Sequence, residues 1–247
     1  MLHRFSRSEL LLGTENIKKL AQTKVAIFGI GGVGSFVAEG LARGGIGNFV
    51  LIDSDDISLT NTNRQIHALE NTIGQKKTLV MKQRILSINP QAQIQTIEQL
   101  YTPENADLFW QNDYDYVIDA IDDIKGKIDL AVQAEKHHIP IISSMGTANK
   151  LDPQKFVITD ITKTHTCPLA RIMRKALKQR GIKHLKVLFS TEEPHKNYSI
   201  NFTENTSTDT HPAASRKQPL GTLSFVPSIA GLLIAGEVIK DICNINE

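Results

Sequence analysis

The sequence predicts an α/β protein with a doubly wound, mainly parallel sheet and helices on both of its faces. Short apolar runs typical of buried strands alternate with longer segments that have helical periodicity. A glycine-rich turn joins the first strand to the first long helix, and Asp53 ends the next strand, 24 residues after Gly29. An acid about 20 residues after the first glycine is typical of Rossmann-like nucleotide-binding folds.

The alternation of strands and helices runs through residues 1–150. Residues 1–23 are expected to form one or two short helices ahead of the sheet. Strands joined by helices in this way pair in parallel and place helices on both faces of one sheet. The expected order is strand 25–29, helix 33–43, strand 48–53, helix 76–88, strand 93–98, helix 104–110, strand 115–119, helix 124–137 and strand 140–144.

The last hundred residues follow a different pattern. A strand-like segment at 155–161, an amphipathic helix at 168–180 and a strand at 187–190 precede a polar stretch, 191–219. That stretch contains few large apolar residues, and we expect a long flexible loop there. The apolar segment 223–242 is expected to pack back onto the sheet, so the whole chain is predicted to form a single domain.

The composition argues against several classes of protein. A net charge of +2 and a pI near 8.4 are too mild to indicate nucleic-acid binding by the chain as a whole. Two cysteines, Cys167 and Cys243, cannot form a disulfide framework or a four-cysteine zinc site. The segment 220–239 approaches membrane-spanning length, but Pro227 and Glu237 interrupt it, which favours a buried helix. Because the N-terminus does not resemble a signal peptide, we expect a cytoplasmic protein.

The glycine-rich turn carries the first functional signal. Gly29, Gly31 and Gly34 form a G-x-G-x-x-G pattern, and Gly32 adds a further glycine. A strand that turns on glycines into a helix presents free backbone N–H groups and the positive end of the helix dipole to an anion. Without Cβ atoms the turn lets a phosphate approach closely, and Asp53 is placed to bind ribose hydroxyls.

Loops that follow the predicted strands carry polar side chains at the edge of the sheet that borders the ligand crevice. Arg64 and Lys77 are placed to contact phosphates, and Mg²⁺ is the usual cation between a phosphate chain and an acid such as Asp122. The alternatives are that these cations are solvated surface charges and that Asp122 or Asp123 caps helix 124–137. The candidate nucleotide-binding residues after the glycines are Asp53, Asp55, Asn61, Arg64, Gln65, Lys77 and Asp122.

Four segments resemble the ubiquitin-activating-enzyme superfamily of the ThiF/MoeB type: GIGGVG at 29–34, DSDDISLTNTNRQ at 53–65, GQKK at 74–77 and DAIDD at 119–123. Members of that superfamily adenylate a carboxylate with Mg-ATP. The resemblance implies that Asp53 holds the ribose, that Asn61, Arg64 and Lys77 contact the phosphates, and that Asp122 binds Mg²⁺. It also implies a homodimer in which Arg7 reaches the ATP of the other protomer. The implied catalytic residues are Arg7, Arg64, Lys77 and Asp122.

Segments 61–68, 144–148, 167–171 and 189–194 are similar to a narrower group, the tRNA threonylcarbamoyladenosine dehydratases. The implied reaction activates the side-chain carboxylate of threonylcarbamoyladenosine in tRNA as an acyl-adenylate. A nucleophile of the carbamoyl group then closes a ring and expels AMP, which is a net dehydration. The resemblance makes 151–247 the substrate-binding and dimer half, after a nucleotide-binding half, and it allows a sulfur-transfer accessory protein as a further partner.

Three other functions stay open on the sequence alone. An adenylyltransferase for a ubiquitin-like or sulfur-carrier protein shares the ATP motifs, although the sulfur-carrier enzymes often carry CxxC pairs for zinc and this sequence has none. An NAD-dependent oxidoreductase shares the glycine pattern but leaves Arg64, Lys77 and Asp122 without a task. A non-catalytic binding module is disfavoured by the complete set of phosphate and metal residues.

A local excess of positive charge points to RNA. The segment from Ile161 to Thr191 contains no Asp or Glu but eight Lys or Arg residues. On helix 168–180 a basic face is predicted opposite an apolar side made of Leu169, Ile172, Met173 and Ala176, and such a face suits the phosphate backbone of tRNA. A solvated basic surface is the alternative. The candidate tRNA-binding residues are Arg171, Arg174, Lys175 and Lys178.

Overall fold

The computed structural model describes residues 2–110, 113–198 and 220–245, and all strands of this part of the chain belong to one sheet. The sheet has the order β3-β2-β1-β4-β5-β7-β6. Every neighbouring pair is parallel except β6 and β7, which are antiparallel. The strands are β1 Lys24–Phe28, β2 Asn48–Ile52, β3 Gln93–Ile97, β4 Tyr116–Asp119, β5 Ile141–Ser144, β6 Phe156–Asp160 and β7 Lys186–Ser190.

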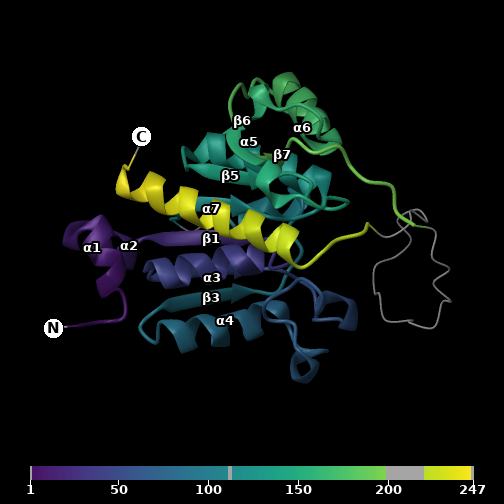
Figure 1. Ribbon diagram of the computed structural model, residues 1–247. Helices are drawn as coiled ribbons and strands as arrows, with labels where there is room; N and C mark the ends of the chain where they lie inside the picture. Colours follow the sequence, from purple (N-terminus) through teal and green to yellow (C-terminus); the bar gives the residue numbers. More distant parts are fainter. Residues whose placement is uncertain (1, 111–112, 199–219, 246–247) are drawn as a thin grey trace.

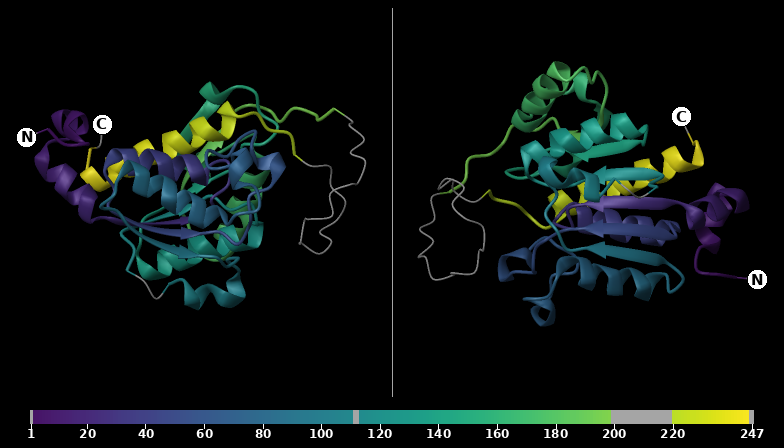
Figure 2. Two further views of the ribbon diagram at one scale, coloured as in Figure 1. Left: turned by 90° about the horizontal axis from the view of Figure 1, so that it is seen from below. Right: turned by 180° about the vertical axis from the view of Figure 1, so that it is seen from behind.

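Helices cover both faces of the sheet, which confirms the predicted fold class (Figures 1 and 2). Val25 and Ile27 of β1 pack into one core together with α2, α3, α4 and α7, while Ala26 and Phe28 pack into a second core with α5. This alternation follows from the two-residue period of a strand buried on both sides. The α-helices are α1 Ser6–Leu12, α2 Thr14–Gln22, α3 Gly34–Gly44, α4 Lys77–Ile88, α5 Ile124–His137, α6 Pro168–Gln179 and α7 Phe225–Cys243.

Helix α7 crosses α3 at close range, and glycines make this possible. A Cβ atom on Gly40 would lie 2.7 Å from the Cβ of Ala235, and one on Gly231 would lie 2.5 Å from the carbonyl oxygen of Val33. The apolar segment that approached membrane-spanning length therefore forms a helix that packs on the sheet. In the part of the chain that the structure describes, none of the helices has both the length and the apolar character needed to cross a bilayer.

The structure differs from the expected elements in small ways. The helix expected at 104–110 is a 3₁₀ helix, Pro103–Leu108, and further 3₁₀ turns occur at Leu59–Asn61, Glu70–Thr72, Pro153–Lys155 and Ile161–Lys163. Part of the predicted flexible loop, 199–219, lies outside the described residues, and residues 191–198 contain neither helix nor strand. The division into a nucleotide-binding and a substrate-binding half stays a prediction.

Candidate nucleotide site

In the order β3-β2-β1-β4-β5-β7-β6 the connections diverge between β1 and β4, and folds of this kind bind ligands in a crevice at the carboxyl ends of those two strands. The turn after β1 lies against the end of β4: a Cβ on Gly29 would come within 2.6 Å of the carbonyl oxygen of Ala120, and Gly29 has a φ of +87°. A Cβ on Gly34 would lie 1.8 Å from the carbonyl oxygen of Gly29. Both positions therefore require glycine, and the turn presents bare backbone to the crevice.

Asp53 joins the glycine turn to the loop after β2. One carboxylate oxygen accepts a hydrogen bond from the backbone N–H of Ile30 at 2.7 Å, and the other accepts one from Asp55 at 2.9 Å. Burial raises the pKa of the Asp53 carboxyl, although Lys77 and the two backbone N–H groups oppose the shift. Lys77 is buried, with its Nζ 2.6 Å from Asp55 and 3.8 Å from Asp53. The structure therefore brings these three predicted residues together.

Arg64 and Gln65 reach the glycine turn from the loop that follows. A Cβ on Gly32 would lie 3.4 Å from Cγ of Arg64, and one on Gly31 would lie 4.0 Å from Nε2 of Gln65. Burial lowers the pKa of the Arg64 guanidinium, which donates to the carbonyl of Thr60 at 2.8 Å. Oε1 of the buried Gln65 has no hydrogen-bond partner within the described residues, and a bound ligand could supply one.

Asn61 is also buried at this loop, but its side chain has a structural task. Its Oδ1 accepts a hydrogen bond from the backbone N–H of Ser58 at 3.1 Å, which closes the 3₁₀ turn ahead of Arg64. The amide nitrogen is left to contact a ligand. The predicted phosphate contact of Asn61 therefore remains a proposal.

The capping alternative for the acids after β4 is resolved in favour of Asp123. Its carboxylate accepts a hydrogen bond from the backbone N–H of Gly126 at 2.6 Å and caps α5. Asp122 is exposed beside it and does not cap the helix. Across the described residues no group of three or more His, Cys, Asp or Glu could hold a metal by itself. Asp122 suits Mg²⁺ bound jointly with substrate phosphates, which needs only one or two carboxylates.

Sequence reasoning missed a buried ionic network below this turn. Nζ of Lys127 on α5 lies 2.9 Å from Oδ1 of Asp119 and also donates to the carbonyl of Ile121 at 3.0 Å. The Ser143 hydroxyl donates to the other oxygen of Asp119. Asp119, Lys127 and Ser143 are all fully buried. The sequence offered one sign of this network, a Lys eight positions after the Asp that ends β4. Only the three-dimensional structure shows that Lys127, Asp119 and Ser143 meet.

Arg7 lies far from the glycine turn of its own chain. It is exposed on α1, which packs near the end of the sheet where the parallel strands begin, while the glycine turn lies at the end where they finish (Figure 1). The five residues of β1 alone span about 16 Å between these ends. Arg7 therefore cannot complete the nucleotide site of its own chain.

The basic helix α6 is rotated relative to the prediction. Its buried residues are Ala170, Met173 and Leu177, whereas Ile172, expected on the apolar side, is 47% exposed. Arg174 turns inward and donates to the carbonyl of Thr164 at 2.9 Å. The exposed cations of the predicted set are Arg171, Lys175 and Lys178.

A glycine turn, an acid at the end of the next strand and two cations near that turn are together typical of a nucleotide-binding α/β protein. The chain belongs to the ThiF family, which it matches over residues 5–247. It is 46% identical to Bacillus subtilis tRNA threonylcarbamoyladenosine dehydratase over 98% of this chain and 95% of that protein. It is also similar to the crystal structure of the Escherichia coli tRNA N6-threonylcarbamoyladenosine dehydratase in complex with AMP. The TM-score is 0.86 at 32% identity, covering 98% of this chain and 94% of the other.

A different group of relatives matches less completely. A maize protein named adenylyltransferase and sulfurtransferase MOCS3-1 is 28% identical over 100% of this chain but only 45% of its own length. The comparisons therefore favour the dehydratases over the carrier-protein adenylyltransferases, which were the main alternative.

Proposed function

We propose that the protein is an ATP-dependent tRNA threonylcarbamoyladenosine dehydratase. The observation that carries this proposal is the similarity to dehydratases over nearly the full length of both chains. In the reaction, a carboxylate oxygen of the threonylcarbamoyl group attacks the α-phosphorus of ATP and pyrophosphate leaves. A nucleophile of the carbamoyl group then attacks the activated carbonyl carbon, the ring closes and AMP leaves. The net change in the nucleoside is the loss of one water.

The chain supplies positioning and charge for this reaction. The glycine turn would hold phosphate oxygens through backbone N–H groups, and Asp53 would accept from the ribose. Arg64 and Lys77 would neutralise charge that develops on the phosphates. Lys77 now contacts Asp55 at 2.6 Å, so phosphate binding requires it to share or leave that carboxylate. Mg²⁺ held by Asp122 would supply further charge neutralisation when bound.

A homodimer with Arg7 acting on the partner's ATP is part of this proposal. Two features of α1 support it. None of its residues is buried, and Leu10 and Leu11 are 86% and 88% exposed, which leaves an apolar face for another surface to cover. Arg7 also lies at the edge of the sheet remote from its own crevice. We further propose a cytoplasmic protein with a sulfur-transfer accessory partner, on the resemblance alone.

Contact between α6 and tRNA is the remaining part of the proposal. Arg171, Lys175 and Lys178 are exposed in a segment without acidic residues, which suits backbone phosphates. Arg174 supports this surface indirectly, because it holds the preceding loop through Thr164.

The test is a reconstituted reaction. The purified protein, ATP, Mg²⁺ and tRNA containing threonylcarbamoyladenosine should yield a nucleoside lighter by one water, together with AMP and pyrophosphate in equal amounts. Mass spectrometry of the digested tRNA measures the nucleoside. Pyrophosphate exchange stimulated by a small carrier protein and not by tRNA would instead support the adenylyltransferase alternative.

A further inference from the structure

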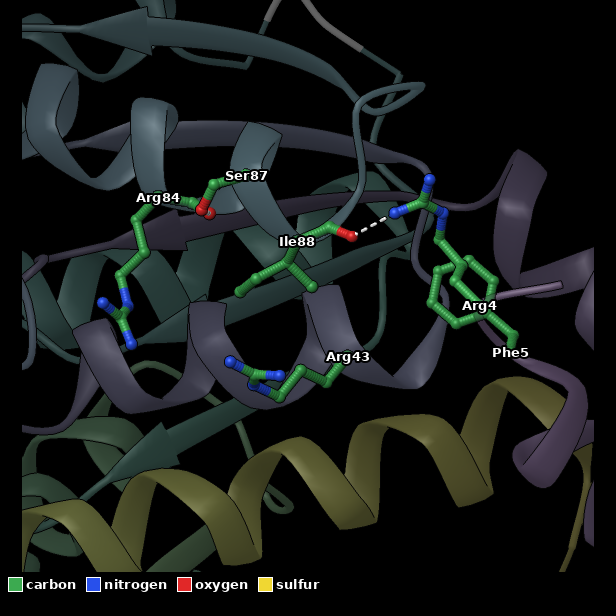
Figure 3. A pocket seen from close by; sticks show the side chains of 6 residues that line it. All are labelled: Arg4, Phe5, Arg43, Arg84, Ser87 and Ile88. Carbon is green, nitrogen blue, oxygen red and sulfur yellow. Dashed lines mark hydrogen bonds between the residues drawn. The ribbon is translucent and has the colours of Figure 1, made fainter.

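A pocket lined by three arginines lies at the end of the sheet remote from the nucleotide crevice. We call it the arginine pocket. It has a volume of about 430 Å³ and opens where the ends of α3 and α4 meet the segment that leads into α1 (Figure 3). Its lining residues are Arg4, Phe5, Arg43, Arg84, Ser87 and Ile88.

A carboxylate beneath the pocket fixes two of the arginines. Nε of Arg43 lies 2.8 Å from one oxygen of Glu39, and Nε of Arg84 lies 2.7 Å from the other. Burial by itself raises the pKa of Glu39, but hydrogen bonds from Arg84 and Arg43 outweigh it and hold the pKa below its usual value. The ionised carboxylate is therefore a fixed anchor that orients both guanidinium groups.

The pocket keeps a surplus of positive charge after this pairing. Glu39 is only 7% exposed, whereas the Arg43 side chain is 61% exposed, so the terminal N–H groups of Arg43 still face solvent. Arg4 adds a third cation from outside the pair, held by its 2.5 Å hydrogen bond to the carbonyl of Ile88. The lining contains no carboxylate within the described residues, and three cations over one buried anion leave two positive charges.

Neutralising Glu39 does not account for this arrangement. The Arg43 side chain is 61% exposed, so pairing with the buried Glu39 uses only part of its guanidinium, and Arg4 brings a further charge to the pocket while it binds the carbonyl of Ile88. Arg84 donates to Glu39 through both Nε and Nη2, at 2.7 and 3.2 Å, so it adds positive charge to the lining but no free fork. Arg43 and Arg4 each use one nitrogen in the bonds described above, and a phosphate can accept hydrogen bonds from their other N–H groups. The pocket therefore has the features of an anion site.

We propose that the arginine pocket binds a backbone phosphate of the RNA substrate, on nucleotides that flank the modified one. This inference rests on the proposed function. Arg43 follows Gly34 by nine residues on α3, which separates the pocket from the glycine turn by about 14 Å along the helix. A nucleic-acid strand rises ~3.4 Å per nucleotide and covers that distance in about four nucleotides. An RNA whose modified base enters the crevice thus reaches the pocket with its flanking strand.

The test measures tRNA binding directly, in the full-length protein, with tRNA that contains threonylcarbamoyladenosine. Arg4→Gln and Arg43→Gln should each raise the Kd for tRNA roughly fivefold. Each should also lower the slope of log Kd against log salt by about 0.7–0.9, the contribution of one phosphate contact. Arg43→Lys, which keeps the charge, should retain most of the affinity. The matched control is Lys136→Gln, which removes one exposed charge from α5 on the opposite face of the sheet and should change neither quantity.

Arg4→Gln leaves the pairing of the buried Glu39 with Arg43 and Arg84 intact, so a loss of tRNA affinity in this variant is not explained by a disturbed ion pair. If both Gln variants melt like the wild-type protein and bind tRNA with unchanged Kd and salt slope, the proposal is overturned. It is also overturned if the variants change only the sedimentation behaviour, because the pocket would then hold an acidic group of a second copy.

The same measurements separate this proposal from the proposed function. If the wild-type protein forms the cyclic nucleoside and the variants bind tRNA normally, only the proposal for the arginine pocket is refuted. If the wild-type protein binds tRNA through the pocket but forms no cyclic nucleoside, only the proposed function is refuted. If the wild-type protein binds no tRNA, both are refuted.

Discussion

Replacing Lys127 with methionine would leave the carboxylate of Asp119 buried without its cation. Both side chains are fully buried and 2.9 Å apart, so water cannot take the place of the ammonium group. Removing one partner of a buried ion pair costs about 3–5 kcal/mol. In a protein of this length each kcal/mol lowers the melting temperature by about 2–4 °C. The expected fall is therefore about 6–20 °C, measured by scanning calorimetry.

The double variant Asp119→Asn/Lys127→Met separates lost charge pairing from lost packing. Removing both charges should restore more than half of the stability lost in the single variant, because no uncompensated charge remains. Lys127→Met protein that melts within about 2 °C of wild type would refute the buried pair. A double variant no more stable than the single one would refute the electrostatic explanation.

The same pair of variants tests whether Lys127 positions Asp122. Nζ of Lys127 also holds the carbonyl of Ile121, next to Asp122, and neither variant can make that bond. The double variant should therefore need more Mg²⁺ for half-maximal turnover even where its stability is regained, while Ser143→Ala should not. A double variant with wild-type Mg²⁺ dependence would show that Lys127 serves folding alone.

Three further predictions follow from individual side chains. Arg64→Ala and Lys77→Ala should each lower turnover at least tenfold. Because Arg64 is the less buried of the two, its variant should keep a circular dichroism spectrum and a melting temperature close to wild type. A fully active Arg64→Ala variant would show that Arg64 does not contact the phosphates. The pKa of the buried His67 is lowered from 6.5 to about 4 by burial and by nearby Lys77 and Arg84. The unfolded chain therefore binds the proton first, so stability present above pH 6.5 should fall by about 3 kcal/mol as the pH drops toward 4. Urea unfolding at several pH values measures this, and His67→Gln should abolish that part of the slope. Lys175→Glu/Lys178→Glu should raise KM for tRNA and leave KM for ATP unchanged; equal tRNA kinetics would exclude α6 from the RNA surface.

The fold and the inner wall of the crevice were predictable because they depend on local patterns. Strand and helix periods gave the order of the elements, and the glycine spacing located a turn whose Gly29 and Gly34 positions cannot hold a Cβ. Asp53 was expected near the glycine turn because the carboxyl ends of parallel strands lie at the same end of a sheet, and Lys77 was expected there because it lies in the connection that follows Asp53.

What the sequence could not predict depends on how elements meet. The assignment of the helix cap to Asp123 and not Asp122 depends on where α5 begins, a matter of one residue. The Lys127 network joins β4, α5 and β5, so it exists only once the sheet order is known. The orientation of α6 departs from the pattern of apolar residues along the helix: Arg174 bonds the carbonyl of Thr164 in the preceding loop, and Ile172 is 47% exposed.

The acyl-adenylate is the central claim, and the fate of one carboxylate oxygen tests it most directly. tRNA whose threonylcarbamoyl carboxylate carries a heavy oxygen isotope is converted by the wild-type protein in one turnover, and the nucleotide products are examined by mass spectrometry. Attack on the α-phosphorus predicts one heavy oxygen in AMP and none in pyrophosphate. Formation of ADP with the heavy oxygen in inorganic phosphate, or unlabelled AMP, would contradict activation by adenylation.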